Sequence, residues 1–311
     1  MTGPIDMPND SSPTRPVAVV TAFRAPDDLV GRIDALSAQV DKVVVVDDGS
    51  RSLARLGLDS PDVVTIELDE NVGIAAALNV GLEKARELGA THVVTMDQDS
   101  ELPDGYVSEA LRHLERLYAQ GRRPAAVSPA RFGEFLVSTT PGTPHPRDPI
   151  QSGQVVPMSV FDEVGGFDER LFIDGVDTEF TLRARGAGYE FWVLPGSDMD
   201  HSLGEKIPVM LFGKHLTLFG KKRNHYYHAP FRTYYAVRNG LVLWRLHHRG
   251  NLGWLTRRTL ALFWVTALGI VLSADRGAQF VATVHGLGDG VRMRLGRIPE
   301  KTLRAISRRR R

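Results

Sequence analysis

Mainly apolar runs alternate with amphipathic segments along the first half of the chain, and this alternation restricts the possible folds more than any other feature. Residues 17–23 (VAVVTAF) and 43–46 (VVVV) are typical of strands that are buried on both faces of a parallel sheet. Residues 29–40 and 72–88 carry apolar side chains at helical spacing. Strands that alternate with helices of this length imply right-handed crossovers. The sequence therefore predicts an α/β fold with a mostly parallel, Rossmann-like sheet.

Acidic residues follow two of the predicted strands. Asp47 and Asp48 end the second strand, and Asp97 and Asp99 follow the strand predicted over residues 91–96. Ligands of open α/β sheets bind beyond the carboxyl ends of the strands, and side chains two residues apart on a strand point to one side. Either acidic pair alone could be a solvated turn. Because both occur at strand ends, Asp97 and Asp99 predict a site for Mg²⁺ or Mn²⁺ that leaves coordination positions for diphosphate oxygens. The pair Asp47 and Asp48 predicts a carboxylate that contacts a ribose or a base edge.

Charge is divided unequally between the two parts of the chain. Residues 201–311 contain 21 Lys and Arg against 4 Asp and Glu, a net charge of +17, whereas residues 1–200 contain 17 against 33, a net charge of −16. The basic part is expected to meet an anionic partner, either a membrane surface or nucleic acid. No nucleic-acid-binding motif is present, so we expect no nucleic acid partner. The absence of cysteine excludes disulfides and cysteine metal sites and is consistent with the cytoplasm.

Seven short motifs, found in a fixed order, make the functional prediction more specific. They are TAF, VVVVDDGS, NVGIAAALNVGL, MDQDS, SGQVV, VGGFDERLFIDGVDTEFTLRARGAGY and HSLG, and they extend over roughly residues 16–245. Together they resemble the inverting family-two nucleotide-sugar glycosyltransferases, and more narrowly their bacterial rhamnosyltransferase branch. The resemblance implies the glycosyltransferase A fold with a C-terminal basic helical extension. It also implies metal-dependent transfer of L-rhamnose from dTDP-L-rhamnose to a lipid-linked glycan acceptor in bacterial cell-envelope polysaccharide synthesis.

The resemblance assigns three groups of residues to this reaction. The donor would be contacted by Thr21, Phe23, Asp48, Asn71, Gly73, Asn79, Asp97, Ser152 and Gly153. The metal ion, Mn²⁺ or Mg²⁺, would be held by Asp97, Asp99 and His201. The acceptor would be contacted by Arg232, Tyr235, Arg238 and Asn239. Bound there, the ion would neutralise the negative charge that develops on the departing diphosphate.

The resemblance also places the catalytic base, at Asp177 in the segment FIDGVDTEF. Such a base takes the proton from the acceptor hydroxyl as its oxygen attacks the anomeric carbon with inversion. Val176 stands where the family commonly has Glu and Asp174 lies nearby, so Asp174 and Glu179 stay open as alternative bases. On a helix, Asp174 and Asp177 would share a face, whereas Glu179 would point elsewhere. Apart from the resemblance, these acids would be ordinary charges at a helix N-terminus.

Two arginines follow on the same predicted helix. Arg183 and Arg185 are two residues apart, so at most one of them is expected to face the diphosphate. The other is expected to be solvated.

The domain boundaries follow from the same patterns. Residues 1–15 are expected to form a disordered tail, neither a signal nor an anchor, residues 16–201 a nucleotide-sugar-binding catalytic domain, and residues 202–311 a basic, aromatic-rich helical region for acceptor and membrane. Residues 259–274 contain no charge but are shorter than a spanning helix, so we expect an interfacial or re-entrant helix, with a buried core helix as the alternative. With the cations of residues 308–311, this region predicts peripheral attachment to the cytoplasmic face of the inner membrane.

Three other functions are weighed against this one. A galactofuranosyl or other hexosyl transferase that uses a UDP-sugar differs only in its donor and acceptor. A non-catalytic, membrane-peripheral nucleotide-sugar-binding protein would not need Asp177. A nucleotidyltransferase would need a Gly-rich, Lys-containing phosphate loop after the first strand, where this chain has TAFRAPDD. We therefore expect an inverting glycosyltransferase.

Overall fold

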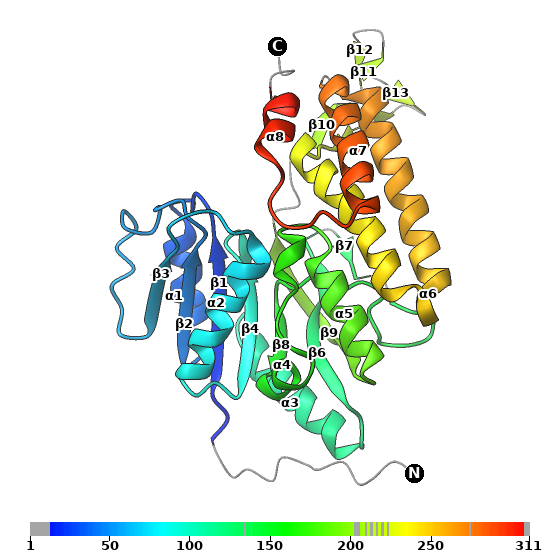
Figure 1. Ribbon diagram of the computed structural model, residues 1–311. Helices are drawn as coiled ribbons and strands as arrows, with labels where there is room; N and C mark the ends of the chain where they lie inside the picture. Colours follow the sequence, from blue (N-terminus) through cyan, green and yellow to red (C-terminus); the bar gives the residue numbers. More distant parts are fainter. Residues whose placement is uncertain are drawn as a thin grey trace.

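The structure is a computed structural model that describes residues 13–133, 135–137, 139–201, 206–208, 210–211, 214–215, 217–218, 221–222, 224–273 and 275–307. Its centre is a sheet of nine strands in the order β3-β2-β1-β4-β8-β6-β9-β5, with β7 beside β6 (Figure 1). The strands are β1 (Pro16–Ala22), β2 (Lys42–Asp47), β3 (Val63–Glu67), β4 (His92–Asp97), β5 (Ser100–Glu101), β6 (Pro124–Phe132), β7 (Phe135–Leu136), β8 (Gln154–Pro157) and β9 (Glu190–His201).

Most of the longer strands run in the same direction. β1, β2, β3 and β4 are parallel, and β6 and β9 are parallel to each other. β8 lies between β4 and β6 and runs antiparallel to both, and the two-residue strands β5 and β7 are antiparallel to their neighbours. The predicted α/β class with a mostly parallel sheet is therefore confirmed.

Helices cover both faces of the sheet. α1 (Leu29–Ser37) and α3 (Tyr106–Ala119) pack on one face, while α2 (Ile74–Glu87), α4 (Met158–Val164) and α5 (Val176–Gly186) pack on the other. Alternate residues of a strand point to opposite faces. Val17 and Val19 of β1 therefore lie in the core beneath α2, whereas Ala18 and Val20 lie in the core beneath α1.

The close contact between α2 and β1 depends on small residues in the NVGIAAALNVGL motif. Ala75 and Ala77 are completely buried, and a Cβ atom added to Gly81 would lie 2.2 Å from Cγ1 of Val19. A larger side chain at Gly81 would displace the helix from the sheet. Close packing accounts for these small residues.

A helical region follows the sheet. It contains α6 (Pro230–Leu272), α7 (Arg276–Val291) and α8 (Glu300–Ser307), and short strand pairs precede it: β10 (Lys206–Pro208) with β15 (Asn224–Tyr226), β11 (Met210–Leu211) with β12 (Lys214–His215), and β13 (Thr217–Leu218) with β14 (Lys221–Lys222). α6 and α7 lie side by side above the sheet (Figure 1). α6 bends where Arg249 and Gly250 leave the helical conformation.

The second part of α6 is apolar but faces outward. Phe263, Trp264 and Val271 are 60%, 62% and 64% exposed. Among the helices that the structure describes, α6 is the one that is long and apolar enough to cross a membrane by length and composition, and only 6% of its apolar 18-residue window is buried. The alternative of a buried core helix over residues 259–274 is therefore wrong.

Two buried side chains of α6 fasten neighbouring segments to the helix. Arg238 is completely buried and donates hydrogen bonds to the carbonyl oxygens of Leu171 (2.8 Å) and Gly296. The Asn239 amide donates to the carbonyl oxygens of Ile173 (2.8 Å) and Asp174 (2.7 Å). The expectation that Arg238 contacts an acceptor does not fit this position, because its donors are directed to main-chain oxygens and to Oδ1 of Asn239 inside the protein. The structure gives Arg238 a supporting position instead.

Replacement of Arg238 tests this supporting position. Arg238→Met removes the hydrogen bonds that the buried guanidinium donates to Leu171, Gly296 and Asn239, and we expect it to lower the free energy of unfolding, measured by urea denaturation, by about 3 kcal/mol. Arg232→Gln on the same helix is the control, since the Arg232 side chain is 47% exposed and pairs with Asp174. We expect that variant to lose less than about 1 kcal/mol. Equal stability of the Arg238 variant and the wild type would contradict the supporting role.

Candidate active site

A cavity of about 1050 Å³ lies beyond the carboxyl ends of β1, β2 and β4, and α6 forms its far wall. Of the residues that the sequence assigns to the reaction, it is lined by Thr21, Phe23, Asp48, Asn71, Gly73, Asp97, Asp99, Asp174, Asp177, Arg232, Tyr235 and Asn239. The strand ends meet because β1 pairs in register with both neighbours, so that Thr21 lies opposite Asp97 and Ala22 opposite Asp47. Acidic residues that are distant in the sequence thus share one cavity.

The acidic pair after β2 has two different environments. Asp47 is completely buried outside the cavity, and it accepts hydrogen bonds from the main chain and hydroxyls of Ser50 and Ser52, which outweigh burial and lower its pKa. Asp48 lines the cavity and accepts from the main-chain N–H groups of Val72 (2.6 Å) and Gly73 (3.0 Å). Desolvation still raises the pKa of Asp48. Asp48 therefore both orients the loop before α2 and presents a carboxylate to the cavity.

Asp97, at the end of β4, is in a strongly anionic environment. Desolvation, together with the nearby negative charges of Asp99 and Asp177, raises its pKa to about 7. Gln151 donates a hydrogen bond to Oδ1 of Asp97 (2.6 Å), which opposes the increase. A group of carboxylates that repel one another at neutral pH is stabilised by a cation.

The donor set fits the divalent metal that the resemblance implies. Carboxylate oxygens are preferred ligands of Mg²⁺ and are compatible with Mn²⁺. Among the described side chains, no group of three His, Asp or Glu residues could hold a metal ion. An ion held by the carboxylates of Asp97 and Asp99 would have coordination positions left for diphosphate oxygens and water. The side chain of His201 lies outside the described residues. Its main chain pairs with Ser100, the residue after Asp99.

Asp177 lies in the first turn of α5 and lines the cavity. Its pKa is raised to about 6, mainly by desolvation and also by the negative charge of Asp148, while the positive charge of Arg258 opposes the increase. Thr178 links these neighbours, because its hydroxyl donates to Asp148 (2.9 Å) and accepts from Arg258 (3.3 Å). Asp177 is thus a carboxylate that can accept a proton near neutral pH.

Asp174 reaches the same cavity by a different route from the one predicted. α5 begins at Val176, and Asp174 precedes it in a left-handed conformation with φ of +64°. The prediction that Asp174 and Asp177 share a helical face is therefore wrong. The Asp174 carboxylate pairs with Arg232 on α6, whose Nε lies 3.2 Å away.

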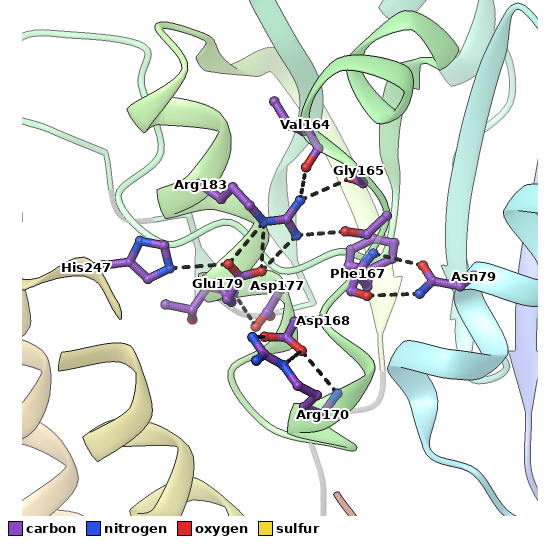
Figure 2. Close-up of polar contacts among 12 residues, drawn as sticks. Asn79, Val164, Gly165, Phe167, Asp168, Arg170, Asp177, Glu179, Arg183 and His247 are labelled. Carbon is purple, nitrogen blue, oxygen red and sulfur yellow. Dashed lines mark hydrogen bonds and ion pairs between the residues drawn. The ribbon is translucent and has the colours of Figure 1, made fainter. Parts of the chain in front are cut away.

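The remaining charged residues of α5 bind other parts of the protein and do not line the cavity. Glu179 is buried and accepts hydrogen bonds from Arg183 (2.8 Å) and from the ring of His247 (3.2 Å). Arg183 also donates to the carbonyl oxygens of residues 164–166, so that Figure 2 shows it joining α5 to the preceding loop. Arg185 donates to main-chain oxygens of residues 146–147. Neither arginine lines the cavity, and neither does Glu179, so the alternative base at Glu179 is not supported.

Three residues expected to contact the donor lie behind the cavity wall. Asn79 holds Phe167, accepting from its N–H group (2.8 Å) and donating to its carbonyl oxygen (2.9 Å) (Figure 2). It lines a different groove, beside β3 and α2. Ser152 is completely buried and accepts from the N–H group of Asp97 (3.0 Å). Gly153 donates to the Thr95 oxygen (2.7 Å). The last two support Asp97 and its strand, and none of the three faces the cavity.

Sequence reasoning does not find several residues that line the cavity. Asp148 lies in a Pro-rich loop, Arg258 borders the uncharged segment of α6, and Arg297 lies after α7. Each is a common residue type in an ordinary context. The one sequence signal is Gln151, which directly precedes the SGQVV motif.

Sequence comparisons relate the chain to known proteins. The family model for Glycosyl transferase family 2 matches residues 17–140. The chain is 31% identical over 231 residues to the dTDP-rhamnosyl transferase RfbF of Shigella flexneri, covering 70% of this chain and 75% of that relative. It is 28% identical over 159 residues to an uncharacterized protein of Mycobacterium tuberculosis, covering 47% of this chain and 59% of that protein.

Solved structures show the same fold. The structure of S. aureus TarS 1-349 in complex with UDP-GlcNAc matches with a TM-score of 0.55 and 15% identity, covering 93% of this chain and 83% of that chain. A longer TarS chain matches with a TM-score of 0.53 and 14% identity, covering 93% of this chain and 50% of that chain. The predicted glycosyltransferase A fold is confirmed. With the family model and RfbF, the predicted family is confirmed as well, and the chain belongs to glycosyltransferase family 2.

Proposed function

We propose that this chain transfers L-rhamnose from dTDP-L-rhamnose to a lipid-linked glycan during synthesis of a bacterial cell-envelope polysaccharide. The observation that carries the proposal is the convergence of Asp97, Asp99 and Asp177 on one cavity in a relative of a dTDP-rhamnosyl transferase. A volume of about 1050 Å³ has room for a nucleotide-sugar together with the reacting end of an acceptor.

The donor would lie against the carboxyl ends of the parallel strands. Thr21, Phe23 and Asp48 would contact the nucleoside, and Asn71 and Gly73 the ribose and phosphates. Asp97 and Asp99, with His201, would hold Mn²⁺ or Mg²⁺. When bound, such an ion acts as a Lewis acid that neutralises charge on the departing diphosphate.

Asp177 would act as the catalytic base. The acceptor hydroxyl gives its proton to the Asp177 carboxylate while its oxygen bonds to the anomeric carbon. The bond between that carbon and the diphosphate oxygen, on the opposite face, breaks at the same time. Its electron pair leaves with dTDP. Asp148, Thr178 and Arg258 hold the surroundings of Asp177, while Asp174 is committed to Arg232.

Replacement of the base tests this function. With dTDP-L-rhamnose, Mn²⁺ and a lipid-linked acceptor, Asp177→Asn is expected to lower kcat about 100-fold or more, because the amide cannot take the proton. Asp174→Asn is the matched control and is expected to retain most of the activity. A chelator should stop transfer by the wild type, and UDP-sugars should be poorer donors. Undiminished turnover by the Asp177 variant would reject the assignment, and transfer from UDP-sugars alone would reject the donor.

The pH dependence of kcat/KM offers a second test. Because Asp177 works only when deprotonated and its pKa is about 6, kcat/KM is expected to fall as the pH drops through that value. Asp148→Asn removes a negative charge and should move the fall to lower pH. Arg258→Gln removes a positive charge and should move it to higher pH. If neither variant moves the profile, these groups do not tune the base.

We further propose that the helical region attaches to a membrane, where a lipid-linked acceptor would be found. Ala261, Leu262 and Val265 of α6 line the cavity, while Phe263 and Trp264 of the same segment are exposed. α7 adds further exposed apolar side chains, among them Phe280 and Val291. An apolar surface beside a basic region is typical of interfacial helices. The site would thus open next to the lipid.

Vesicle binding tests the attachment. With vesicles of phosphatidylglycerol and phosphatidylcholine, the double variant Phe263→Ala/Trp264→Ala is expected to sediment about tenfold less than the wild type, because it loses two apolar side chains. Leu136→Ala is the control, since Leu136 is 69% exposed but lies on β7. Binding by the wild type should weaken at high salt. Equal binding of both variants would contradict insertion of α6.

A further inference from the structure

The chain returns to the cavity after α7. Residues 294–299, here called the C-terminal strap, run between α7 and α8. The N–H group of Gly296 donates to the carbonyl oxygen of Arg170 (2.6 Å), and the N–H group of Ile298 donates to the Tyr235 hydroxyl (2.7 Å). Ile298 is 6% exposed and packs in the cluster that contains Tyr234 and Tyr235. The strap is thus fixed on both sides of residue 297.

Arg297 is the residue between these two anchors, and its side chain lines the cavity. Arg297 forms an ion pair with Glu70, in which the two charged groups lie 3.3 Å apart and the side chains are 57% and 73% exposed. An ion pair this exposed contributes little to folding stability. The buried bonds of Gly296 and Ile298 hold the strap, so Arg297 is not needed as a fastening.

Arg297 lies at the end of the cavity that is next to Asp48 and Asn71. Its positive charge acts on Asp48, where it favours the charged carboxylate, and Glu70 directly precedes Asn71. This is the side of the cavity where the strand β2 ends and α2 begins, and where we place the nucleotide. Carboxylates line the cavity at the strand ends. An anionic ligand at this end of the cavity therefore needs a positive charge from another part of the chain.

We propose that Arg297 is a donor-binding residue, whose guanidinium donates hydrogen bonds to the nucleoside diphosphate of the donor. This inference rests on the proposed function, which places a nucleotide in the cavity. An arginine side chain presents planar, permanently charged donors that match phosphate oxygens. Before the donor binds, Glu70 holds the guanidinium at the cavity wall. When the donor binds, Arg297 exchanges the Glu70 carboxylate for the ligand.

Because of this exchange, a role of Arg297 in donor binding can be distinguished from a role in holding the strap. If the Arg297–Glu70 pair only fastened the strap, removal of either partner would have the same effect. If Arg297 binds the donor, removal of Glu70 frees the guanidinium, whereas removal of Arg297 deletes the contact. Glu70 does not line the cavity, so its replacement leaves the other donor contacts in place.

The test is calorimetric binding of dTDP and UDP to the full chain with Mn²⁺ present. Arg297→Gln is expected to raise the Kd of the nucleotide about tenfold or more, and Arg297→Lys to raise it less. Glu70→Gln should leave the Kd unchanged or lower it. Arg294→Gln is the matched control, because Arg294 is on the same strap, is 68% exposed and does not line the cavity. Thermal unfolding of each variant shows whether it is folded.

The possible outcomes are distinct. A Kd of Arg297→Gln within twofold of the wild type, or equal weakening in Arg297→Gln and Glu70→Gln, would overturn the inference while leaving the proposed function intact. If the wild type bound neither dTDP nor UDP, the proposed function would be overturned, and this inference with it.

Discussion

Repulsion among carboxylates at one end of the sheet is the interaction on which the arrangement of the molecule depends. Asp177 lies far from Asp97 and Asp99 in the sequence, and the negative charges of Asp99 and Asp177 contribute to the raised pKa of Asp97. The register of β1 with β2 and β4 makes this concentration of charge unavoidable, because it brings the strand ends to one edge. The rest of the site can be understood as compensation for that charge.

Part of the compensation comes from the basic C-terminal region. Arg232 pairs with Asp174, Arg258 with Asp148, and Arg297 with Glu70. Each pair joins the basic part of the chain to its acidic part. The opposite net charges of the two parts, which suggested an external anionic partner, therefore also reflect a contact inside the molecule. The helical region is a wall of the cavity as well as a candidate membrane surface.

The motifs were good predictors where a side chain acts at the end of a strand. Asp48, Asp97 and Asp99 reach the cavity because strand direction and side-chain alternation are local properties. In the motif SGQVV, Ser152 binds the main chain of Asp97 and Gly153 that of Thr95, whereas Gln151, just before the motif, binds the Asp97 carboxylate. Arg183 and Glu179 bind each other instead of a ligand, because α5 turns that side toward the preceding loop.

The sequence by itself determined the α/β class, the strand ends that carry carboxylates and the family, since these depend on local periodicity and on residues close together in the chain. Only the tertiary structure decided which cations face the site, that Arg238 is an internal support, and that the apolar part of α6 lies outside the core. Those features depend on contacts between residues up to more than two hundred positions apart, as for Arg297 and Glu70. Such contacts leave no periodic pattern in a single sequence, because any arginine or apolar segment could make them.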